Sequence, residues 1–380
     1  MPATSWSAAS ASIVSRQAQK SLPSVRPRSA RWKAWQWAFT KPGIWTTSST
    51  SKTIRPLLRR LLVVGVAGVC LGMPAVARAG TVAIFYYPWY GTPSHDGAWE
   101  HWNQNLHHPP RDLYSRFYPV GGPYSSGDPA VVDQQMAEIA AAGVDEVVVS
   151  WWGRGSDEDR RLPLVLADAR RHGLKVAIHL EPYGDRSPAT VAQDLVYLSS
   201  LGIRDVFVYH PRDFAAADWA GVRANAPPGM RLFAGTQLIG FAAAGHFDGF
   251  YTYDFTTWGG AKFARLCAEA HAVHLLCAPS VGPGYDGTRA GEASATMPRR
   301  AGATYDALWA AVLAARPDIV SITSFNEWGE GTQIEPAAAR LGYRCYSGAW
   351  GLTGLAAQTA YLVRTAYWTG RFHTAAPVTR

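Results

Sequence analysis

The chain is 380 residues long, 48% hydrophobic and 17% charged, the composition of a globular protein with a sizeable core in one large domain or two ordinary ones. Its formal net charge of +8 is misleading, because residues 1–79 contain 12 Arg and Lys residues and no acidic residue. The remainder has 24 basic against 28 acidic residues, a net charge of −4. That balance argues against nucleic acid as a partner, since such a body has little general attraction for phosphate backbones.

Two segments of different character precede the globular part. Residues 1–50 are rich in Ser, Ala, Thr and basic residues and lack acids, so we expect a disordered leader or a start codon assigned too far upstream. Residues 51–79 have the order of a secretory signal peptide, with a basic run, an apolar stretch from Leu61 and a final Ala77-Arg78-Ala79. We expect cleavage before Gly80 and a secreted or periplasmic protein. A membrane anchor is the alternative if the segment stays uncleaved.

From residue 81 onward, short β-branched apolar runs alternate with longer amphipathic ones. The predicted strands are 81–89, 144–151, 174–180, 205–209, 231–236, 250–254, 275–279 and 319–325. The predicted helices are 129–142, 162–172, 190–201, 218–225, 241–244, 261–271, 305–315 and 352–367. Eight alternations favour an α/β fold of the (β/α)8 TIM-barrel type, a single catalytic domain over 80–380. A doubly wound sheet is less compatible, because no Gly-rich dinucleotide fingerprint follows a strand.

Three cysteines follow the predicted cleavage site: Cys267, Cys277 and Cys345. Three cysteines form at most one disulfide, so the protein is not a disulfide scaffold. Neither their spacing nor that of the histidines after the first strand matches a metal site, and we expect no metal and no cofactor.

Polar and aromatic residues gather where the predicted strands end, which is where a barrel carries its active site. These strand-end segments are Tyr86-Tyr87-Pro88-Trp89-Tyr90, Ser150-Trp151-Trp152-Gly153, His179-Leu180-Glu181-Pro182-Tyr183, Tyr251 to Asp254, and Asn326-Glu327-Trp328-Gly329-Glu330. His179 and Glu181 share one face of their strand. They either bind substrate hydroxyls or orient another carboxylate, or they form a satisfied pair inside the barrel. The 16 Trp and 17 Tyr residues suit stacking on sugar rings, or a large aromatic core.

Glu327 and Glu330 are the strongest candidates for catalysis. A carboxyl group among aromatic rings is desolvated, which raises its pKa and lets it act as an acid near neutral pH. A second, ionised carboxylate beside it supplies a base, and cleavage of a glycosidic bond needs that division of roles. The alternative is that one of the two is a salt-bridged loop residue.

These segments resemble glycoside hydrolase family 99, the endo-α-mannosidase family, over nearly all of residues 81–370. The matching segments are Phe85 to Gly91, Asp96-Gly97 with His101-Trp102-Asn103, Ser150 to Gly153, His179 to Tyr183, Pro283 to Asp286, and Asn326 to Pro336. The resemblance implies a retaining endo-hydrolase of α-mannosides, or of similar α-glycans, that forms a 1,2-anhydro sugar. By position, Glu327 is then the base for the 2-hydroxyl, and Glu330 protonates the leaving oxygen and later activates water. A carboxylate nucleophile is the general default for retaining enzymes.

The same resemblance implies the sugar-binding residues and the partner. The candidates for substrate binding are Tyr86, Trp89, Tyr90, Trp151, Trp152, His179, Glu181, Tyr183, Tyr253 and Asn326. We expect an oligo- or polysaccharide substrate, a monomer, and no membrane contact beyond the signal segment. The sequence departs from the family at Gly329, where members with established mannosidase character have His. A glycan-binding barrel without turnover, or a protein that assembles or trims cell-surface polysaccharide, is therefore the alternative.

Overall fold

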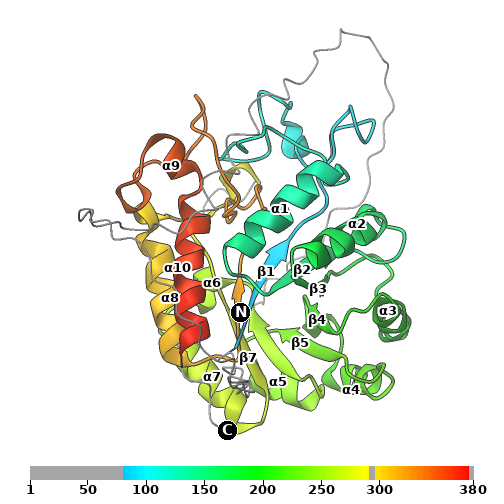
Figure 1. Cartoon of the computed structure of the whole chain (residues 1–380). Coiled ribbons are helices and arrows are strands. Elements are labelled where there is room, and N and C mark those ends of the chain that lie inside the picture. The colour runs from blue at the N-terminus through cyan, green and yellow to red at the C-terminus, as the bar shows by residue number, and fades with distance from the viewer. Residues whose placement is uncertain (1–79, 291–295, 376–380) are drawn as a thin grey trace, which may run out of the picture. The chain divides into compact units, whose positions relative to one another are not determined.

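The computed structural model describes residues 80–290 and 296–375 (Figure 1). The predicted leader at 1–50 and the predicted signal peptide at 51–79 lie outside the described residues. Eight parallel strands close a barrel in the order β1-β10-β7-β6-β5-β4-β3-β2, which confirms the (β/α)8 prediction. The barrel strands are β1 Thr81–Tyr86, β2 Glu146–Trp151, β3 Lys175–Leu180, β4 Asp205–Val208, β5 Arg231–Gly235, β6 Gly249–Thr252, β7 Leu276–Val281 and β10 Ile319–Ile322. A separate antiparallel pair consists of β8 Tyr285–Asp286 and β9 Thr296–Met297.

Helices alternate with these strands along the chain (Figure 1). They are α1 Pro129–Ala141, α2 Asp157–Arg171, α3 Pro188–Ser200, α4 Ala216–Ala224, α5 Ile239–Ala244, α6 Phe255–Trp258, α7 Lys262–Ala272, α8 Ala303–Ala315, α9 Gly354–Gln358 and α10 Ala360–Thr374. No helix within 80–290 and 296–375 is long and apolar enough to cross a membrane.

Two helices begin or divide at points that the apolar pattern did not indicate. Helix α2 begins at Asp157 rather than 162, because the Ser156 side chain caps the Asp159 amide and three acids occupy the positive first turn. The predicted helix 352–367 is in fact two helices, α9 and α10, which meet at the non-helical residue Thr359.

Successive residues of each strand face opposite sides of the barrel wall. Phe85 and Tyr87 face the interior, where they meet Phe207 of β4 and Tyr251 of β6. The residue between them, Tyr86, faces the outer core between the barrel and its helices. The alternation decides which strand-end aromatic residues can reach a ligand in the barrel mouth.

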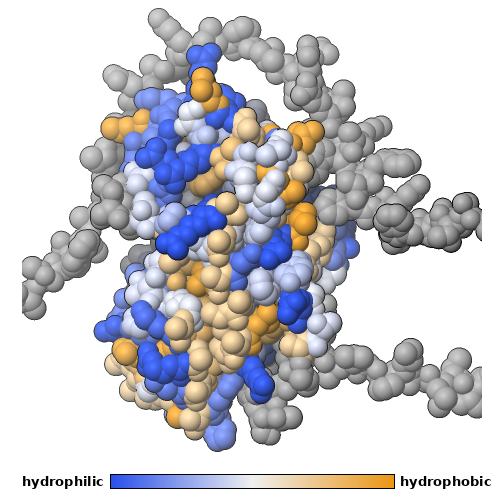
Figure 2. All heavy atoms as spheres, turned by 90° about the vertical axis from the view of Figure 1, so that its left-hand side faces the viewer, coloured by the Kyte–Doolittle hydropathy of each residue, from blue (hydrophilic) through white to orange (hydrophobic). Residues whose placement is uncertain are grey.

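Helices α8 and α10 lie side by side on the outside of the barrel (Figure 1). The Trp309 and Trp368 rings stack across them, with centroids 6.2 Å apart. Asp306 accepts hydrogen bonds from Arg364, Trp350 and Trp368. Figure 2 shows the outer face of this side, where weakly apolar surface is interrupted by hydrophilic side chains.

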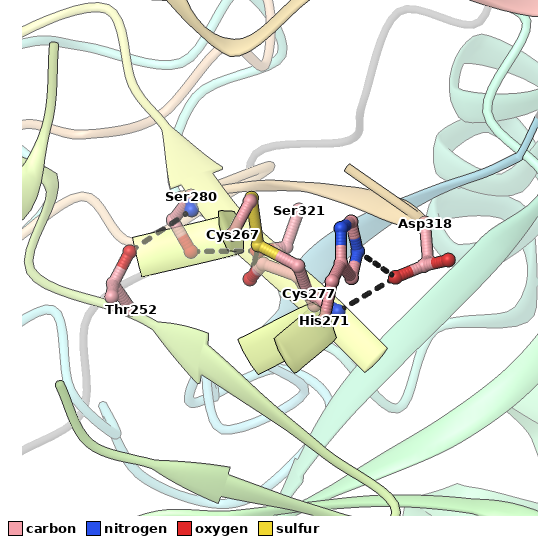
Figure 3. Close-up of a disulfide and its surroundings, with 8 residues drawn as sticks. Thr252, Cys267, His271, Cys277, Ser280, Asp318 and Ser321 are labelled. Carbon is pink, nitrogen blue, oxygen red and sulfur yellow. Dashed lines mark hydrogen bonds and ion pairs between the residues drawn. A yellow bond between two sulfur atoms is a disulfide. The ribbon is translucent and has the colours of Figure 1, made fainter. Parts of the chain in front are cut away.

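A disulfide joins Cys267 of α7 to Cys277 of β7, and Cys345 is free (Figure 3). The same two elements are tied through Asp318, whose carboxylate lies 3.0 Å from His271 Nε2 and accepts from the Cys277 amide. The helix is therefore fixed to the barrel wall both covalently and by hydrogen bonds.

Candidate active site

The segment that follows β10 folds into a tight loop that carries both predicted catalytic carboxyl groups. The Phe325 amide continues the barrel ladder by donating to the Phe85 carbonyl (2.8 Å). The Glu327 amide then donates to Ser324 Oγ (2.8 Å). The loop closes with a hydrogen bond from the Thr332 amide to the Glu327 carbonyl (3.3 Å). Glu327 and Glu330 therefore lie together at the carboxyl-terminal end of the strands, where barrel enzymes act.

Glu327 is buried and is held by its own loop. Its Oε1 accepts hydrogen bonds from the amides of Gly329 (3.0 Å) and Glu330 (3.3 Å). Its Oε2 is buried and has no hydrogen-bond partner among the described residues. Burial raises the pKa of Glu327 well above its usual range, and the neighbouring charge of Glu330 raises it further. One oxygen thus fixes the carboxyl group, and the other is a buried acceptor that still needs a hydrogen-bond donor.

Glu330 has a different environment, since it is only partly buried. The Tyr253 hydroxyl donates to Glu330 Oε2 (3.2 Å). The Tyr253 hydroxyl also lies 2.6 Å from the Tyr87 hydroxyl, and either of the two can be the donor in this contact. Two interior tyrosines therefore form a chain that ends on this carboxylate.

Asn326 uses its side chain to join the loop to β1. Its Oδ1 accepts from the Tyr87 amide (2.8 Å), and its Nδ2 donates to the Tyr87 carbonyl (3.0 Å). This pairing explains why β1 ends at Tyr86 and not at residue 89, since a side chain takes the place of the next ladder partner. Tyr90, also buried, donates to the Asn326 carbonyl (2.9 Å) and accepts from the Trp328 amide (3.1 Å). Both residues, predicted to bind substrate, hold the catalytic loop in place.

A buried hydrogen-bond network behind the loop was not predicted from the sequence. Glu335 accepts from Trp328 Nε1 (2.8 Å), from the Tyr124 hydroxyl (2.7 Å) and from Gln135 Nε2 (2.8 Å). Burial raises the pKa of Glu335 to about 7, against the lowering effect of these three donors. The available signal was an acid inside the Ile334-Glu335-Pro336 segment, because an acid in an apolar run needs partners when buried.

Tyr86 completes this network from the outer side of the barrel. It is fully buried, and its hydroxyl donates to Gln135 Oε1 (2.6 Å). Trp151 likewise faces outward and donates to Asp159 of α2 (2.8 Å). The structure therefore does not bring these two predicted substrate-binding residues to the barrel mouth. Strand-end segments rich in aromatic residues do not reveal which of two neighbours faces inward.

His179 and Glu181 lie inside the barrel mouth, and both are buried. His179 Nε2 lies 2.8 Å from the Tyr251 hydroxyl, and its Nδ1 lies 2.9 Å from Glu181 Oε1 without the alignment of a hydrogen bond. Glu181 also accepts from Ser150 Oγ (2.8 Å). The His179 ring stacks on that of Tyr253, with centroids 5.5 Å apart. His179 and Glu181 thus bond to Tyr251 and Ser150 inside the barrel. His179 also contacts Tyr253, the tyrosine that donates to Glu330.

The remaining predicted sugar-binding residues occupy the rim. Trp89 is partly buried and stacks on the His101 ring, with centroids 4.4 Å apart. Trp152 is 38% exposed, so part of its side chain is accessible to a ligand. The Tyr183 hydroxyl is bound to Asp194 of α3, and its ring lies against Gly153. Direct sugar contact by Trp89, Trp152 and Tyr183 stays a prediction.

A pocket with about 100 Å³ of free space adjoins the carboxyl pair through Tyr253. Its lining residues are Tyr209, Gly235, Thr236, Gln237, Tyr251, Thr252, Tyr253, Asp254 and Trp258. Hydroxyl, amide and aromatic groups of this kind suit a polar ligand with an apolar face. In the part of the chain that the structure describes, no three His, Cys, Asp or Glu side chains converge to hold a metal ion.

Comparisons with known proteins agree with this geometry. The sequence model of glycosyl hydrolase family 99 matches residues 79–212 and 234–374. A glycoprotein endo-alpha-1,2-mannosidase from Xenopus laevis is 34% identical over 325 residues, which cover 69% of this chain and 72% of that protein. A glycoprotein endo-alpha-1,2-mannosidase-like protein from Danio rerio is 34% identical over 317 residues, with 68% and 71% covered. The solved endo-alpha-mannosidase of family 99 from Bacteroides thetaiotaomicron has a TM-score of 0.68 at 30% identity, covering 78% of this chain and 98% of that one.

Proposed function

Because the chain belongs to glycosyl hydrolase family 99, we propose that it cleaves α-mannosidic or similar α-glycan linkages inside a glycan chain. The observation that carries this proposal is the Glu327–Glu330 pair in the mouth of the barrel. One carboxyl group is buried with a free oxygen, and the other is partly exposed and bound by Tyr253. Two carboxyl groups in such different environments can take different roles, as acid–base cleavage of a glycosidic bond requires.

The proposed first step uses the sugar's own 2-hydroxyl as the nucleophile. Glu327 removes the proton of the 2-hydroxyl, O2 forms a bond to C1, and the C1–O bond to the leaving sugar breaks as Glu330 donates its proton to that oxygen. The product is a 1,2-anhydro sugar and a shortened chain. The free, buried Oε2 of Glu327 supports this role.

The second step restores the enzyme. Glu330, now ionised, takes a proton from water, the water oxygen bonds to C1, and the C1–O2 bond breaks while Glu327 returns its proton to O2. Two inversions at C1 give net retention. The Tyr253 hydroxyl supports the ionised state of Glu330 in this step, since a donor at 3.2 Å stabilises a carboxylate. The amides of Gly329 and Glu330 hold the Glu327 carboxyl group in place, and both carboxyl groups are present. This argues against a glycan-binding barrel that has lost its catalytic groups.

Activity and mechanism are tested together on a panel of α-mannans and α-mannosides with the full chain. We expect Glu330→Gln to lower hydrolysis by at least about 10³-fold with an unchanged melting temperature, because the leaving oxygen loses its proton donor. A wild-type level of activity in this variant contradicts the assignment. A 2-fluoro substrate separates the two retaining schemes. It traps a glycosyl-enzyme ester, seen by mass spectrometry, if a carboxylate is the nucleophile, and gives no adduct if the 2-hydroxyl is.

We also propose that the protein is exported, to the periplasm or the medium. The order of residues 51–79 supports export. The Cys267–Cys277 disulfide supports it independently, because disulfides persist in oxidising compartments.

A further inference from the structure

Gly329 lies between the two catalytic carboxyl groups, and its lack of a side chain is required by space and not by backbone conformation. Its φ lies outside the left-handed region that favours glycine. A Cβ atom at this position would lie 2.4 Å from Tyr114 Cε1 and 3.0 Å from Tyr114 Cδ1. It would also lie 3.0 Å from Glu327 Oε1. The edge of the Tyr114 ring therefore occupies the space that any side chain at 329 would enter.

Tyr114 belongs to the long connection between β1 and α1, and its backbone is held on both sides. The Tyr114 amide donates to the Trp102 carbonyl (2.9 Å). The preceding residue, Leu113, accepts from Arg289 (2.7 Å) through its carbonyl and donates to the Tyr343 hydroxyl (2.8 Å) through its amide. Anchors from three separate segments give the ring a defined position over Gly329.

The Tyr114 ring covers the point where Glu327 is held. Glu327 Oε1 accepts from the Gly329 amide at 3.0 Å, and the ring edge lies over that same glycine. Tyr114 is only partly buried, so part of its side chain is open to a ligand next to the glycine that holds Glu327. An aromatic face next to reacting carboxyl groups offers a sugar ring apolar contact and one hydroxyl, where a polar residue at 329 would offer a directional hydrogen bond.

We propose that Tyr114 is a specificity-determining residue of this active site, and that Gly329 is the vacancy that admits it. The inference rests on the proposed function for the kind of ligand, a saccharide bound at Glu327 and Glu330. The group that meets the sugar at this point then comes from the β1–α1 connection instead of from the catalytic loop.

Thermal unfolding, without any substrate, tests the claim that the Tyr114 ring fills the space beside Gly329. Gly329→Ala, Tyr114→Ala and the double variant are compared in melting temperature. We expect Gly329→Ala to lower the melting temperature by several degrees in the wild type and by little in the Tyr114→Ala background, because the ring that it meets is gone. An equal loss in both backgrounds overturns the inference whatever the activity of the enzyme.

The specificity part is tested with α-1,2-, α-1,3- and α-1,6-linked mannobiose, by calorimetric dissociation constants and by KM and kcat on the corresponding mannans. We expect Tyr114→Ala to change the order of preference and to raise KM about tenfold, with a smaller change in kcat, and Tyr114→Phe to keep the wild-type order. The matched control is Tyr367→Ala on α10, because Tyr367 is 45% exposed and its ring lies under Arg364 of the same helix. The specificity role of Tyr114 is overturned if Tyr114→Ala keeps the wild-type order of preference among the three linkages, or if the wild type binds none of the mannobioses. Loss of hydrolysis by the wild type alone refutes only the proposed function.

Discussion

Glu335 is the residue whose replacement tests most directly how the catalytic loop is held. Its carboxylate accepts three hydrogen bonds, from Trp328, Tyr124 and Gln135. Trp328 stands between Glu327 and Glu330, the two proposed catalytic residues, so its indole anchors the loop that carries both. Glu335→Gln keeps the size of the side chain and replaces one acceptor oxygen by a donor.

The expected magnitude follows from the partners. With a Gln at 335, an NH2 group faces Gln135 Nε2 at the former 2.8 Å contact, or faces the Trp328 and Tyr124 donors. Turning the Gln135 amide breaks its bond with the Tyr86 hydroxyl. One buried donor is therefore left unpaired, at a cost of about 1–3 kcal/mol.

A second effect opposes this cost. The pKa of Glu335 is raised to about 7 in the folded protein, while in the unfolded chain it is near 4.3. Below that value both states are protonated and the group contributes nothing. As the pH rises toward 7 the unfolded chain releases its proton first, so the free energy of unfolding falls by at most about 3–4 kcal/mol. Gln does not titrate and removes this loss, so we expect the free energy of unfolding of the variant to be unchanged or higher, by up to about 3 kcal/mol, at pH 7.

No opposing effect of this kind acts on kcat. A shift of the loop on the order of 1 Å costs roughly 10²-fold in kcat. We therefore expect Glu335→Gln to lower kcat by about 10- to 100-fold with KM little changed. The assay combines steady-state kinetics with thermal unfolding between pH 4.5 and 8. Gln134→Ala on α1 is the control, since the Gln134 side chain donates to Glu138 of the same helix and not to Glu335. Wild-type kinetics in Glu335→Gln refute the reasoning.

Two further predictions concern the bottom of the barrel and the disulfide. Glu146 is buried beside Asp205, and its pKa is raised to about 8, first by burial and then by the Asp205 charge. The folded state keeps a proton that the unfolded chain releases above about pH 4.3, so the free energy of unfolding falls as the pH rises to 8. We therefore expect Glu146→Gln to raise the melting temperature at pH 8 but not at pH 4.5. An equal shift at both pH values contradicts this. We expect the exported protein to begin at Gly80 and to have one reactive thiol, Cys345, in mass spectrometry after alkylation. Reduction of the Cys267–Cys277 disulfide is expected to lower the free energy of unfolding by about 2–3 kcal/mol. Two further reactive thiols in the unreduced protein refute the pairing.

The architecture, and the place of the candidate catalytic pair after the last barrel strand, followed from local patterns. Eight β-branched runs separated by amphipathic stretches specify a parallel barrel, because each strand must be buried on both faces and each helix on one. Glu327 and Glu330 stood out because two acids among aromatic residues directly follow a buried strand. Both features arise from residues close together in the chain, and a sequence displays such neighbours directly.

The tertiary structure alone decided which aromatic residues face the barrel mouth and what holds the carboxyl pair. Tyr86 and Tyr87 are equally aromatic and, as neighbours along the chain, face opposite sides of the barrel wall. Only the closed barrel decides that Tyr86 is the one that faces outward to Gln135 and Tyr87 the one that faces inward to Tyr253. The Gln135–Glu335 bond joins residues 200 positions apart. Tyr114 and Gly329 are also distant in sequence and meet only in the fold. Such contacts depend on how separate elements pack, and no local periodicity encodes them.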